Sequence, residues 1–314
     1  MSDLIQIVDR KSKKSGYTPR VRKREPGPRP EWLTVRYVRT ETYDTVAETK
    51  NDLGLVTVCE EARCPNRHEC WSAGTATFML MGDICTRRCG FCAVSKGAPR
   101  ELDPDEPRKT GEAVSKLGVK HAVITSVNRD ELPDGGAQHF ADTVTAIRTH
   151  SPQTRIELLV PDFLGDRDAL NTVLDAGPHV VAHNMETISR LYRRVRPQAI
   201  YQRSLDVLAH SKNRGFRIKS GIMLGLGEKQ EEIRQAISDL ARIGLDILTL
   251  GQYLQPSSKY APIDRWATPE EFAQWKKEAH DMGVEVVESG PLVRSSYHAE
   301  EQSARFASDK RVSA

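Results

Sequence analysis

The sequence predicts an α/β fold, a partial (β/α)6-type barrel that is open on one side and carries extensions at both ends of the chain. Two observations predict this class. Short runs rich in β-branched and other apolar residues recur from Thr77 onward, and segments with helical spacing of apolar residues lie between them. Regular alternation of this kind is typical of a parallel sheet curled into a full or partial barrel. Six or seven such strands are fewer than the eight of a closed barrel.

The strands are the first elements to justify. We expect them at residues 77–81, 122–127, 156–160, 180–184, 218–224, 246–250 and 284–288. The clearest helix covers residues 231–243, where Ile233 and Ile237 stand one helical turn apart. His121 and His179 precede strands, so we expect structural or solvent-facing roles for both and assign them no part in catalysis.

Four segments follow from this pattern. They are a disordered basic arm at 1–30, an N-terminal extension at 31–74, a core barrel at 75–283, and a last strand with a C-terminal extension at 284–314. The arm mixes Lys and Arg with Gly and Pro, which is typical of disordered segments. It is either a solvated tail or a surface that attracts an acidic protein partner.

Composition excludes several classes of protein. The formal net charge of +3 is nearly balanced, so we expect no nucleic-acid partner. No run of apolar residues is long enough to span a membrane. The first ten residues lack the apolar core of a signal peptide, and Asp3, Asp9 and Glu25 disfavour an organellar transit peptide. We therefore expect a cytoplasmic protein.

Clustered cysteines are the main functional signal. All six cysteines fall within residues 59–92 and form two triplets: Cys59, Cys64 and Cys70, then Cys85, Cys89 and Cys92. A disulfide framework would need an oxidising compartment. Structural zinc prefers four ligands; His68 is a candidate fourth ligand for the first triplet, but the second triplet has no adjacent histidine.

An iron–sulfur cluster fits the triplets better. Each iron of a [4Fe-4S] cubane needs an external ligand, normally a thiolate. Three thiolates from one loop leave one iron open to a small molecule, as a catalytic metal keeps one position free.

The second triplet carries a resemblance. Cys85, Cys89, the aromatic Phe91 and Cys92 form the pattern C-x-x-x-C-x-Φ-C, which resembles the cluster loop of radical S-adenosylmethionine enzymes. The resemblance implies that these cysteines hold three irons of a [4Fe-4S] cluster and that S-adenosylmethionine chelates the fourth. One electron from the cluster would then generate a 5′-deoxyadenosyl radical.

Two further motifs narrow the resemblance. The segment around the first triplet is similar to the auxiliary-cluster motif of lipoyl synthases; it reads V-C-E-E-A-R-C-P-N-R-H-E-C-W. Near the C-terminus, the sequence R-S-S-Y matches a signature of the same family. The resemblance covers about Trp32 to Ala299. It implies that Cys59, Cys64, Cys70 and Ser296 hold an auxiliary [4Fe-4S] cluster, with Ser295 as the alternative serine. A hard serine oxygen holds iron less durably than a soft thiolate, so the Ser296 iron is where the cluster would open.

The resemblance also implies an activity and its partners. Two sulfur atoms would enter at C6 and C8 of a protein-bound N6-octanoyl-lysine, two S-adenosylmethionine molecules would be cleaved per product, and the auxiliary cluster would be the sacrificial sulfur donor. The implied carriers are the lipoyl domains of 2-oxoacid dehydrogenase E2 subunits and the glycine cleavage H protein. A reductant such as flavodoxin or ferredoxin and an iron–sulfur carrier for cluster repair are also implied.

Strand ends supply the other candidate site residues. Gly135 and Gly136, after the second strand, would expose amide groups to a ligand, and the resemblance places them at the methionine end of S-adenosylmethionine. Asn184 and Glu186, with His183, end the fourth strand and would bind the ribose or the substrate. Gly225, in a segment with Gly227 and Glu228, is similar to one near the adenine in this superfamily.

Two other functions remain open at this point. One is a different radical reaction, such as methylthiolation or sulfur insertion into a free small molecule, although the first triplet and R-S-S-Y count against it. The other is a zinc-stabilised binding protein. Visible absorption discriminates between them, because zinc is colourless and [4Fe-4S] proteins are brown.

Overall fold

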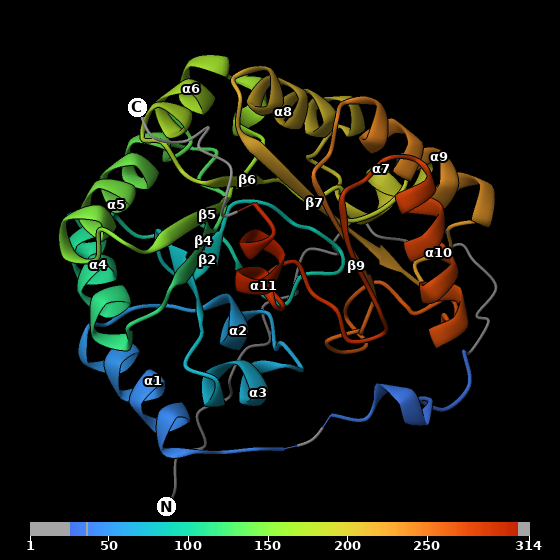
Figure 1. Ribbon diagram of the computed structural model, residues 1–314, viewed down its shortest axis with the longest axis horizontal. Coiled ribbons are helices and arrows are strands. Elements are labelled where there is room, and N and C mark those ends of the chain that lie inside the picture. The colour runs from blue at the N-terminus through green and yellow to red at the C-terminus, as the bar shows by residue number, and fades with distance from the viewer. Residues whose placement is uncertain (1–25, 36, 307–314) are drawn as a thin grey trace, which may run out of the picture.

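The computed structural model describes residues 26–35 and 37–306, so most of the predicted basic arm lies outside the described residues. Seven parallel strands form one curved sheet in the order β1, β4, β5, β6, β7, β8, β9, and helices surround it (Figure 1). Within the described residues, the edge strands β1 and β9 are not paired with each other. The predicted open α/β barrel is therefore confirmed.

The strands have these bounds: β1 Thr77–Leu80, β4 His121–Ser126, β5 Arg155–Leu159, β6 Val180–Ala182, β7 Arg217–Leu224, β8 Ile247–Gln252 and β9 Val286–Ser289. All seven predicted strands are present, displaced by at most two residues at the ends. The carboxyl end of β6, for example, is at Ala182 instead of residue 184. A separate two-stranded sheet pairs β2 Ile84–Cys85 with β3 Ser95–Lys96; the sequence does not predict it.

The helices fall into three groups. An N-terminal group holds η1 Glu31–Leu33, α1 Glu41–Asp52, α2 Val58–Glu61 and α3 Arg67–Ser72. The outer ring holds α4 Glu106–Leu117, α5 Ala137–His150, α6 Arg167–Asp175, α8 Tyr201–Asn213, α9 Gln230–Arg242 and α10 Pro269–Asp281, with η2 Phe163–Gly165, η3 Ser189–Leu191 and α7 Tyr192–Val195 in loops. A last helix, α11 Ala299–Ala304, lies near the centre of the ring (Figure 1).

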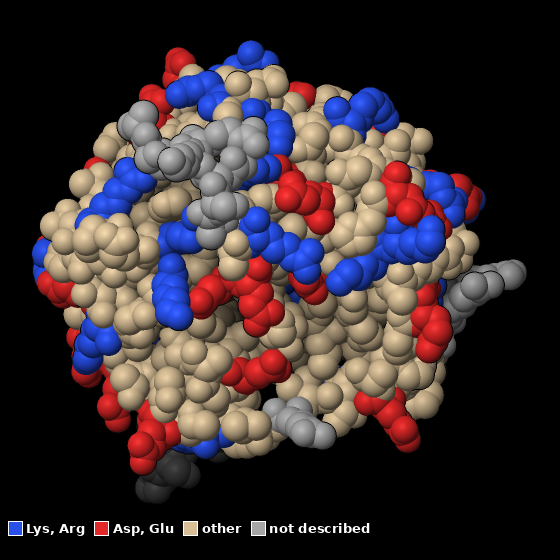
Figure 2. All heavy atoms as spheres, viewed as in Figure 1, with Lys and Arg blue, Asp and Glu red and all other residues tan. Residues whose placement is uncertain are grey.

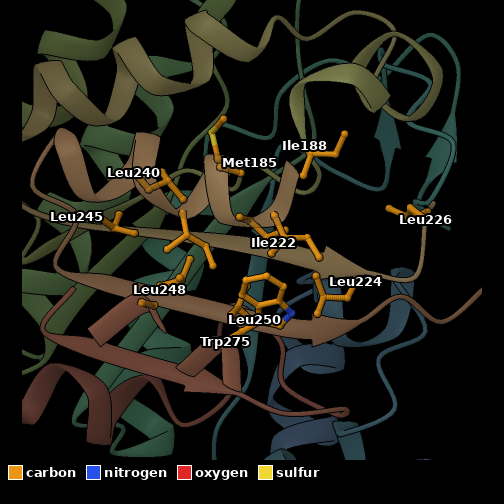
Figure 3. Close-up of a cluster of buried hydrophobic side chains, with 14 of the residues drawn as sticks. Met185, Ile188, Ile222, Leu224, Leu226, Leu240, Leu245, Leu248, Leu250 and Trp275 are labelled. Atoms are coloured by element: carbon orange, nitrogen blue, oxygen red, sulfur yellow. The ribbon is translucent and has the colours of Figure 1, made fainter. Parts of the chain in front are cut away.

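The core explains why the apolar runs form strands. Ile222 and Leu224 of β7 and Leu248 and Leu250 of β8 are at most 2% exposed, and they share one cluster with Trp275 of α10 (Figure 3). Strands buried on both faces read as nearly continuous apolar runs. This is the pattern from which the sheet is predicted.

Helix α11 leads into the amino-terminal end of the barrel. Phe306, just beyond the helix, is buried in a cluster with Val180, Ile247 and Val286, the first residues of three strands. The guanidinium of Arg217 lies over the Phe306 ring, 4.3 Å from its centroid. The C-terminal extension therefore closes the base of the barrel and leaves the carboxyl ends of the strands for chemistry.

Charged side chains fill part of the barrel interior. Lys219 Nζ donates to Glu157 Oε1 at 2.8 Å, and His121 Nε2 lies 3.1 Å from Glu157 Oε2, all three side chains being almost fully buried. His179 Nδ1 accepts a hydrogen bond from the Ile156 amide. His121, the first residue of β4, and His179, which precedes β6, thus both have partners within the protein.

The described residues include no helix of the length and apolarity that membrane spanning requires. Basic and acidic side chains are interspersed on the face shown in Figure 2. This mixture matches the nearly balanced charge of the chain. The predicted division into four segments stays a prediction.

Candidate active site

The second cysteine triplet lies in the loop after β1, at the carboxyl end of the sheet. Cys85 ends β2, and the backbone amide of Asn128, just beyond β4, donates a hydrogen bond of 3.3 Å to Cys85 Sγ. Thr86 Oγ1 donates to the Asn128 carbonyl at 2.9 Å. The cysteine loop is therefore fastened to the end of the neighbouring strand, and one thiol is already oriented by a backbone donor.

Arg87, between the first two cysteines of the motif, anchors the same loop. Its guanidinium donates to both carboxylate oxygens of Asp130, at 2.7 and 2.8 Å, and to Asp162 Oδ1 at 2.5 Å. The Arg87 side chain is only 3% exposed. Bidentate pairs of this kind add geometric specificity, so Arg87 fixes the loop across the ends of β4 and β5.

Cys89 and Cys92 complete this triplet as half-buried free thiols. Burial raises the pKa of both thiols, that of Cys92 to about 12, so each stays protonated until a metal takes it as a thiolate.

All six cysteines are free. The alternative of a disulfide framework is therefore wrong.

The first triplet lies on the two short helices that adjoin β1. Cys59 is in α2, Cys64 follows it in a turn, and Cys70 is in α3. Cys59 is buried in a cluster with Tyr43 and Trp71, while Cys64 and Cys70 are half-buried. Burial raises the pKa of Cys59 to about 11 and that of Cys70 to about 12.

The R-S-S-Y segment packs against this first triplet. Asn66 Nδ2, between Cys64 and Cys70, donates to the Leu292 carbonyl at 2.7 Å. Tyr297 Oη donates to Glu69 Oε1 at 2.8 Å. The structure therefore brings the predicted ligand loop of the first triplet and the predicted serines together, from opposite ends of the chain.

The serines themselves lie in a tight turn. The Tyr297 amide donates to the Arg294 carbonyl at 3.0 Å, which encloses Ser295 and Ser296, and both serines are half-buried. Upstream, Gly251 of β8 lies against this segment so closely that a Cβ there would be 2.1 Å from the Val293 carbonyl oxygen. The glycine lets the segment approach the sheet.

The donor sets fit iron–sulfur clusters. Each triplet presents three soft thiols, which suit iron–sulfur chemistry. In residues 26–35 and 37–306, no three His, Cys, Asp or Glu side chains are grouped as ligands of a single metal ion. A cubane does not require such a group, because each thiolate binds a different iron. His68, the candidate zinc ligand, stacks on the Tyr43 ring with centroids 5.2 Å apart.

The end of β6 gathers charged and polar groups beside the second triplet. Glu186 has a left-handed backbone, with φ of 64°, and accepts a hydrogen bond from Asn184 Nδ2 at 3.1 Å. Arg196 Nη1 donates to the Asn184 and Met185 carbonyls. Burial raises the pKa of Glu186, although the Arg196 charge opposes the shift. Among the described residues, the buried Asn184 Oδ1 has no hydrogen-bond partner.

His183 makes different contacts from Asn184 and Glu186. Its Nδ1 lies 2.8 Å from the Val160 carbonyl and its Nε2 lies 3.0 Å from Ser204 Oγ. Burial lowers the pKa of His183 to about 4. Both ring nitrogens have partners within the protein, so His183 has a structural place.

Gly135 and Gly136 lie in the turn before α5, but their amides are not free. Gly136 donates to Asp134 Oδ1 at 2.9 Å, and Gly135 donates to the Leu132 carbonyl at 3.1 Å. Both amides therefore already have hydrogen-bond partners within the protein. A Cβ on Gly136 would lie 2.2 Å from Met81 Sδ, so this glycine serves close packing against the start of the cysteine loop.

A cavity of about 200 Å³ adjoins this turn. It is bounded by the turn before α5 and by the segment after β5, and its lining includes Asp130, Gly135, Phe163 and Asp166.

The surroundings of Gly225 also explain why a glycine occupies this position. Its amide donates to Glu228 Oε1 at 2.6 Å, and its φ is 101°. A Cβ there would be 2.6 Å from the Arg265 carbonyl oxygen. Arg265 also pairs with Glu228 at 3.1 Å, so this predicted site residue belongs to a closed, buried turn.

Three site residues are not predicted from the sequence: Arg87, Asn128 and Arg196. Arg87 lies inside the cysteine motif, which is the signal that could have found it. Asn128 and Arg196 carry no such signal, because their contacts depend on how the strand ends meet.

Comparison with known proteins places this site in a family. The model of the Radical SAM superfamily matches residues 79–240. The chain is 57% identical to a lipoyl synthase of Rubrobacter xylanophilus over 87% of this chain and 86% of that protein. It is 52% identical to a lipoyl synthase of Koribacter versatilis over 89% of this chain and 92% of that protein. A mitochondrial lipoyl synthase of Nematostella vectensis is 49% identical over 87% and 94% of the two chains.

Similarity to solved structures supports the fold of this chain and nothing beyond the fold. Methylornithine synthase superposes with a TM-score of 0.53 at 15% identity, covering 81% of this chain and 87% of that one. The FeFe-hydrogenase maturase HydG from Carboxydothermus hydrogenoformans gives 0.52 at 13% identity, covering 85% and 82%. The length of chain matched and the high identity to its relatives lead to one assignment: this chain belongs to the lipoyl synthase family of the Radical SAM superfamily.

Proposed function

We propose that this chain inserts two sulfur atoms, at C6 and C8, into an octanoyl chain that is amide-linked to a lysine of a carrier protein. The observation that carries the proposal is the joining of the first cysteine triplet to the R-S-S-Y segment through Asn66 and Leu292. A second cysteine motif lies nearby, in the loop after β1. Alkyl C–H bonds have no acidic proton for a general base, so cofactors must carry the chemistry.

Cys85, Cys89 and Cys92 would hold the first [4Fe-4S] cluster. When bound together with S-adenosylmethionine, this cluster would supply the one-electron radical chemistry that an unactivated C–H bond requires. The protein's part is to fix the loop. Arg87 ties it to Asp130, and the Asn128 amide orients Cys85 Sγ.

Cys59, Cys64, Cys70 and Ser296 would hold a second, auxiliary cluster that serves as the sulfur donor. Ser296 lies in the turn closed by Arg294 and Tyr297, and Tyr297 contacts Glu69 of the first triplet's own segment. A serine oxygen is a harder ligand than a thiolate. Release at Ser296 would open the cluster while the three cysteines keep it attached.

Asn184 and Glu186 are proposed to contact S-adenosylmethionine or the substrate. The unpartnered Asn184 Oδ1 and the Glu186 carboxylate offer acceptors at the end of β6. Gly135, Gly136 and Gly225 would act by close backbone packing, since their amides already have partners.

The proposed partners are octanoylated lipoyl domains of 2-oxoacid dehydrogenase E2 subunits and the H protein of glycine cleavage. A flavodoxin or ferredoxin would supply electrons, and an iron–sulfur carrier would restore the donor cluster in the cytoplasm. A basic arm at 1–30 has the charge to attract an acidic carrier.

The test is anaerobic turnover of the reconstituted chain with S-adenosylmethionine, a reductant and a peptide that contains octanoyl-lysine. Mass spectrometry should detect a dithiolated peptide. Deoxyadenosine without sulfur product would instead indicate a radical enzyme of another kind, and bound zinc without iron would contradict the proposal.

A further inference from the structure

Two neighbouring segments beside the second cysteine triplet carry positive charge and no negative charge. Residues 84–100, which contain the triplet, and residues 187–205 together hold nine basic residues and no Asp or Glu. The basic residues are Arg87, Arg88, Lys96, Arg100, Arg190, Arg193, Arg194, Arg196 and Arg203. Since the formal net charge of the whole chain is only +3, positive charge is concentrated in these two segments.

Hydrogen bonds hold the two segments against each other. The Gly90 amide donates to the Val195 carbonyl at 2.7 Å, and the Arg88 amide donates to Gln198 Oε1 at 2.8 Å. Arg88 directly precedes Cys89 of the triplet. The basic segment at 187–205 therefore lies alongside the loop that carries the cysteines.

Several of the nine cations are already used within the protein. Arg87, Arg190 and Arg203 each form an ion pair with an Asp or Glu of another segment. The side chain of Arg196 is buried and donates to two backbone carbonyls. These four arginines stabilise the loop and the strand ends, so they are not available to a partner.

Arg88 and Arg193 differ from these four arginines. Both side chains are exposed, and no ion pair or side-chain hydrogen bond among the described residues includes either guanidinium. Ile200, two residues after Gln198, is 51% exposed and adds an apolar side chain to the same surface segment. Protein-binding surfaces combine apolar contact with a polar rim. We call Arg88, Arg193 and Ile200 the cationic rim.

We propose that the cationic rim docks an acidic one-electron donor protein that reduces the cluster of the second triplet. This inference rests on the proposed function, because it requires a cluster at Cys85, Cys89 and Cys92. A partner that covers Arg88 comes close to Cys89, and the rate of electron transfer falls steeply with distance. One electron passes from the donor to the cluster, so the donor is oxidised by one electron and no proton or group is transferred.

Charge at the rim should act mainly on the rate of association. Complementary charges raise association rates by about 10- to 1,000-fold, and substitution of such charges changes the rate and its salt dependence. Complexes that transfer electrons are small, with less than about 1,200 Å² buried. Two unpaired arginines are therefore a large part of such an interface.

Arg305 provides a matched control. Its side chain is exposed, and no ion pair or side-chain hydrogen bond among the described residues includes its guanidinium. It follows α11 and precedes Phe306, which is buried at the amino-terminal base of the barrel. This is the end opposite the cysteine loop. The same substitution at Arg305 therefore changes the net charge equally and leaves the cationic rim intact.

The experiment compares two reductants on the reconstituted full chain, with S-adenosylmethionine and the octanoyl-lysine peptide present. One reductant is reduced flavodoxin, an acidic protein, and the other is reduced methyl viologen, a small cation. The variants are Arg193→Glu, the double variant Arg88→Glu/Arg193→Glu, and Arg305→Glu. With flavodoxin, we expect deoxyadenosine formation to fall at least about tenfold in the double variant and less in Arg193→Glu. With methyl viologen, all three variants should match the parent, as should Arg305→Glu with flavodoxin.

Binding provides a second measurement that does not depend on turnover. Calorimetry of the chain with oxidised flavodoxin should give a Kd that is at least about tenfold higher in the double variant and unchanged in Arg305→Glu. Added salt should weaken the complex of the parent more than that of the double variant, because salt screens exposed charges.

The outcomes separate this inference from its alternatives. An unchanged rate with flavodoxin in the double variant, or an equal fall in Arg305→Glu, overturns it. If the double variant loses its iron, Arg193→Glu decides alone, because Arg193 lies outside the cysteine loop: a fall with flavodoxin only supports the inference, and equal rates or equal falls with both reductants contradict it.

Two further results concern other partners and the activity itself. A loss seen only with a whole octanoylated lipoyl domain as substrate and methyl viologen as reductant would assign the cationic rim to the carrier, and so contradict docking of the donor. Deoxyadenosine without dithiolated peptide in the parent would contradict the proposed function. It would not affect this inference, since flavodoxin binding and deoxyadenosine formation are measured without the sulfur product.

Discussion

Asn66 donates a hydrogen bond of 2.7 Å from its side-chain amide to the carbonyl of Leu292, across 226 positions of sequence. Asn66 lies between Cys64 and Cys70, and Leu292 precedes the R-S-S-Y turn. The contact therefore joins the two parts of the chain that would share one cluster.

Gly251→Ala tests whether this attachment matters. The new Cβ would meet the Val293 carbonyl oxygen at 2.1 Å and push the R-S-S-Y segment away from the sheet. Overpacking of this kind costs about 1 to 3 kcal/mol. We expect dithiolated product to fall about tenfold or more, while deoxyadenosine formation stays close to that of the parent, both measured by chromatography of one reaction.

Gly283→Ala is the control for Gly251→Ala. Gly283 has a φ of 95°, and a Cβ there would meet no atom within 4 Å. This variant is strained by about 1 to 3 kcal/mol, but it should keep both activities. Equal loss of sulfur product in the two variants would mean that general destabilisation, and not the position of R-S-S-Y, is responsible.

Alanine variants of the two triplets should separate the two halves of the reaction. Cys85→Ala removes a ligand of the first cluster and should abolish cleavage of S-adenosylmethionine. Cys64→Ala should spare some cleavage but yield no sulfur product. The measurement is deoxyadenosine and dithiolated peptide per chain after a fixed time. Sulfur product from Cys64→Ala would refute the assignment of the donor.

Ser296→Cys probes the release of iron. A thiolate holds iron more durably than a serine oxygen does, so this variant should keep both clusters and fail to form product. Iron content and visible absorbance establish that the clusters are present. Normal sulfur insertion by Ser296→Cys would sink the idea that the serine is needed for opening, and Ser295→Cys provides the neighbouring comparison.

Much of the fold could be predicted from the sequence, because strands buried on both faces read as apolar runs. Ile218, Leu224 and Leu248 belong to such runs. The cysteine motifs are local in sequence, so they could also be recognised there. The attachment of R-S-S-Y to Asn66, the closing of the barrel base by α11 and the place of Arg196 could not. Each depends on a contact between residues far apart in the chain.

The glycines at the strand ends show that a ligand contact cannot be predicted from the residue type alone. Gly135 and Gly136 suggest free amides, yet the Gly136 amide donates a hydrogen bond to Asp134 Oδ1. Gly225 likewise donates to Glu228. A glycine in a loop indicates a close approach or a positive φ, but it does not say whether a ligand or the protein itself is approached.

Lys219→Met tests the ion pair inside the barrel. Burial acts to raise the pKa of Glu157, but the Lys219 ammonium and His121 outweigh it and hold this pKa below its usual value. Removing one partner of a buried pair costs about 3 to 5 kcal/mol. We expect a loss of that size in denaturant unfolding at neutral pH, and the double variant Lys219→Met/Glu157→Leu should recover most of it.

The folding stability of the unsubstituted chain should change with pH in a definite direction. Since the pKa of Glu157 is depressed in the folded state, its stabilisation is present above the unfolded pKa and is lost as the pH falls through the folded pKa. In Lys219→Met this acid-dependent part should disappear or reverse. An unchanged pH profile in the variant would contradict the role given to Lys219.

The most direct test of the central claim is to follow the sulfur. The chain is reconstituted with iron and a heavy isotope of sulfide, freed of unbound sulfide, and reacted once with S-adenosylmethionine, reductant and the octanoyl-lysine peptide. If the cluster at Cys59, Cys64, Cys70 and Ser296 is the donor, both sulfur atoms of the product carry the heavy isotope. Product with light sulfur from a fully labelled chain would contradict that claim.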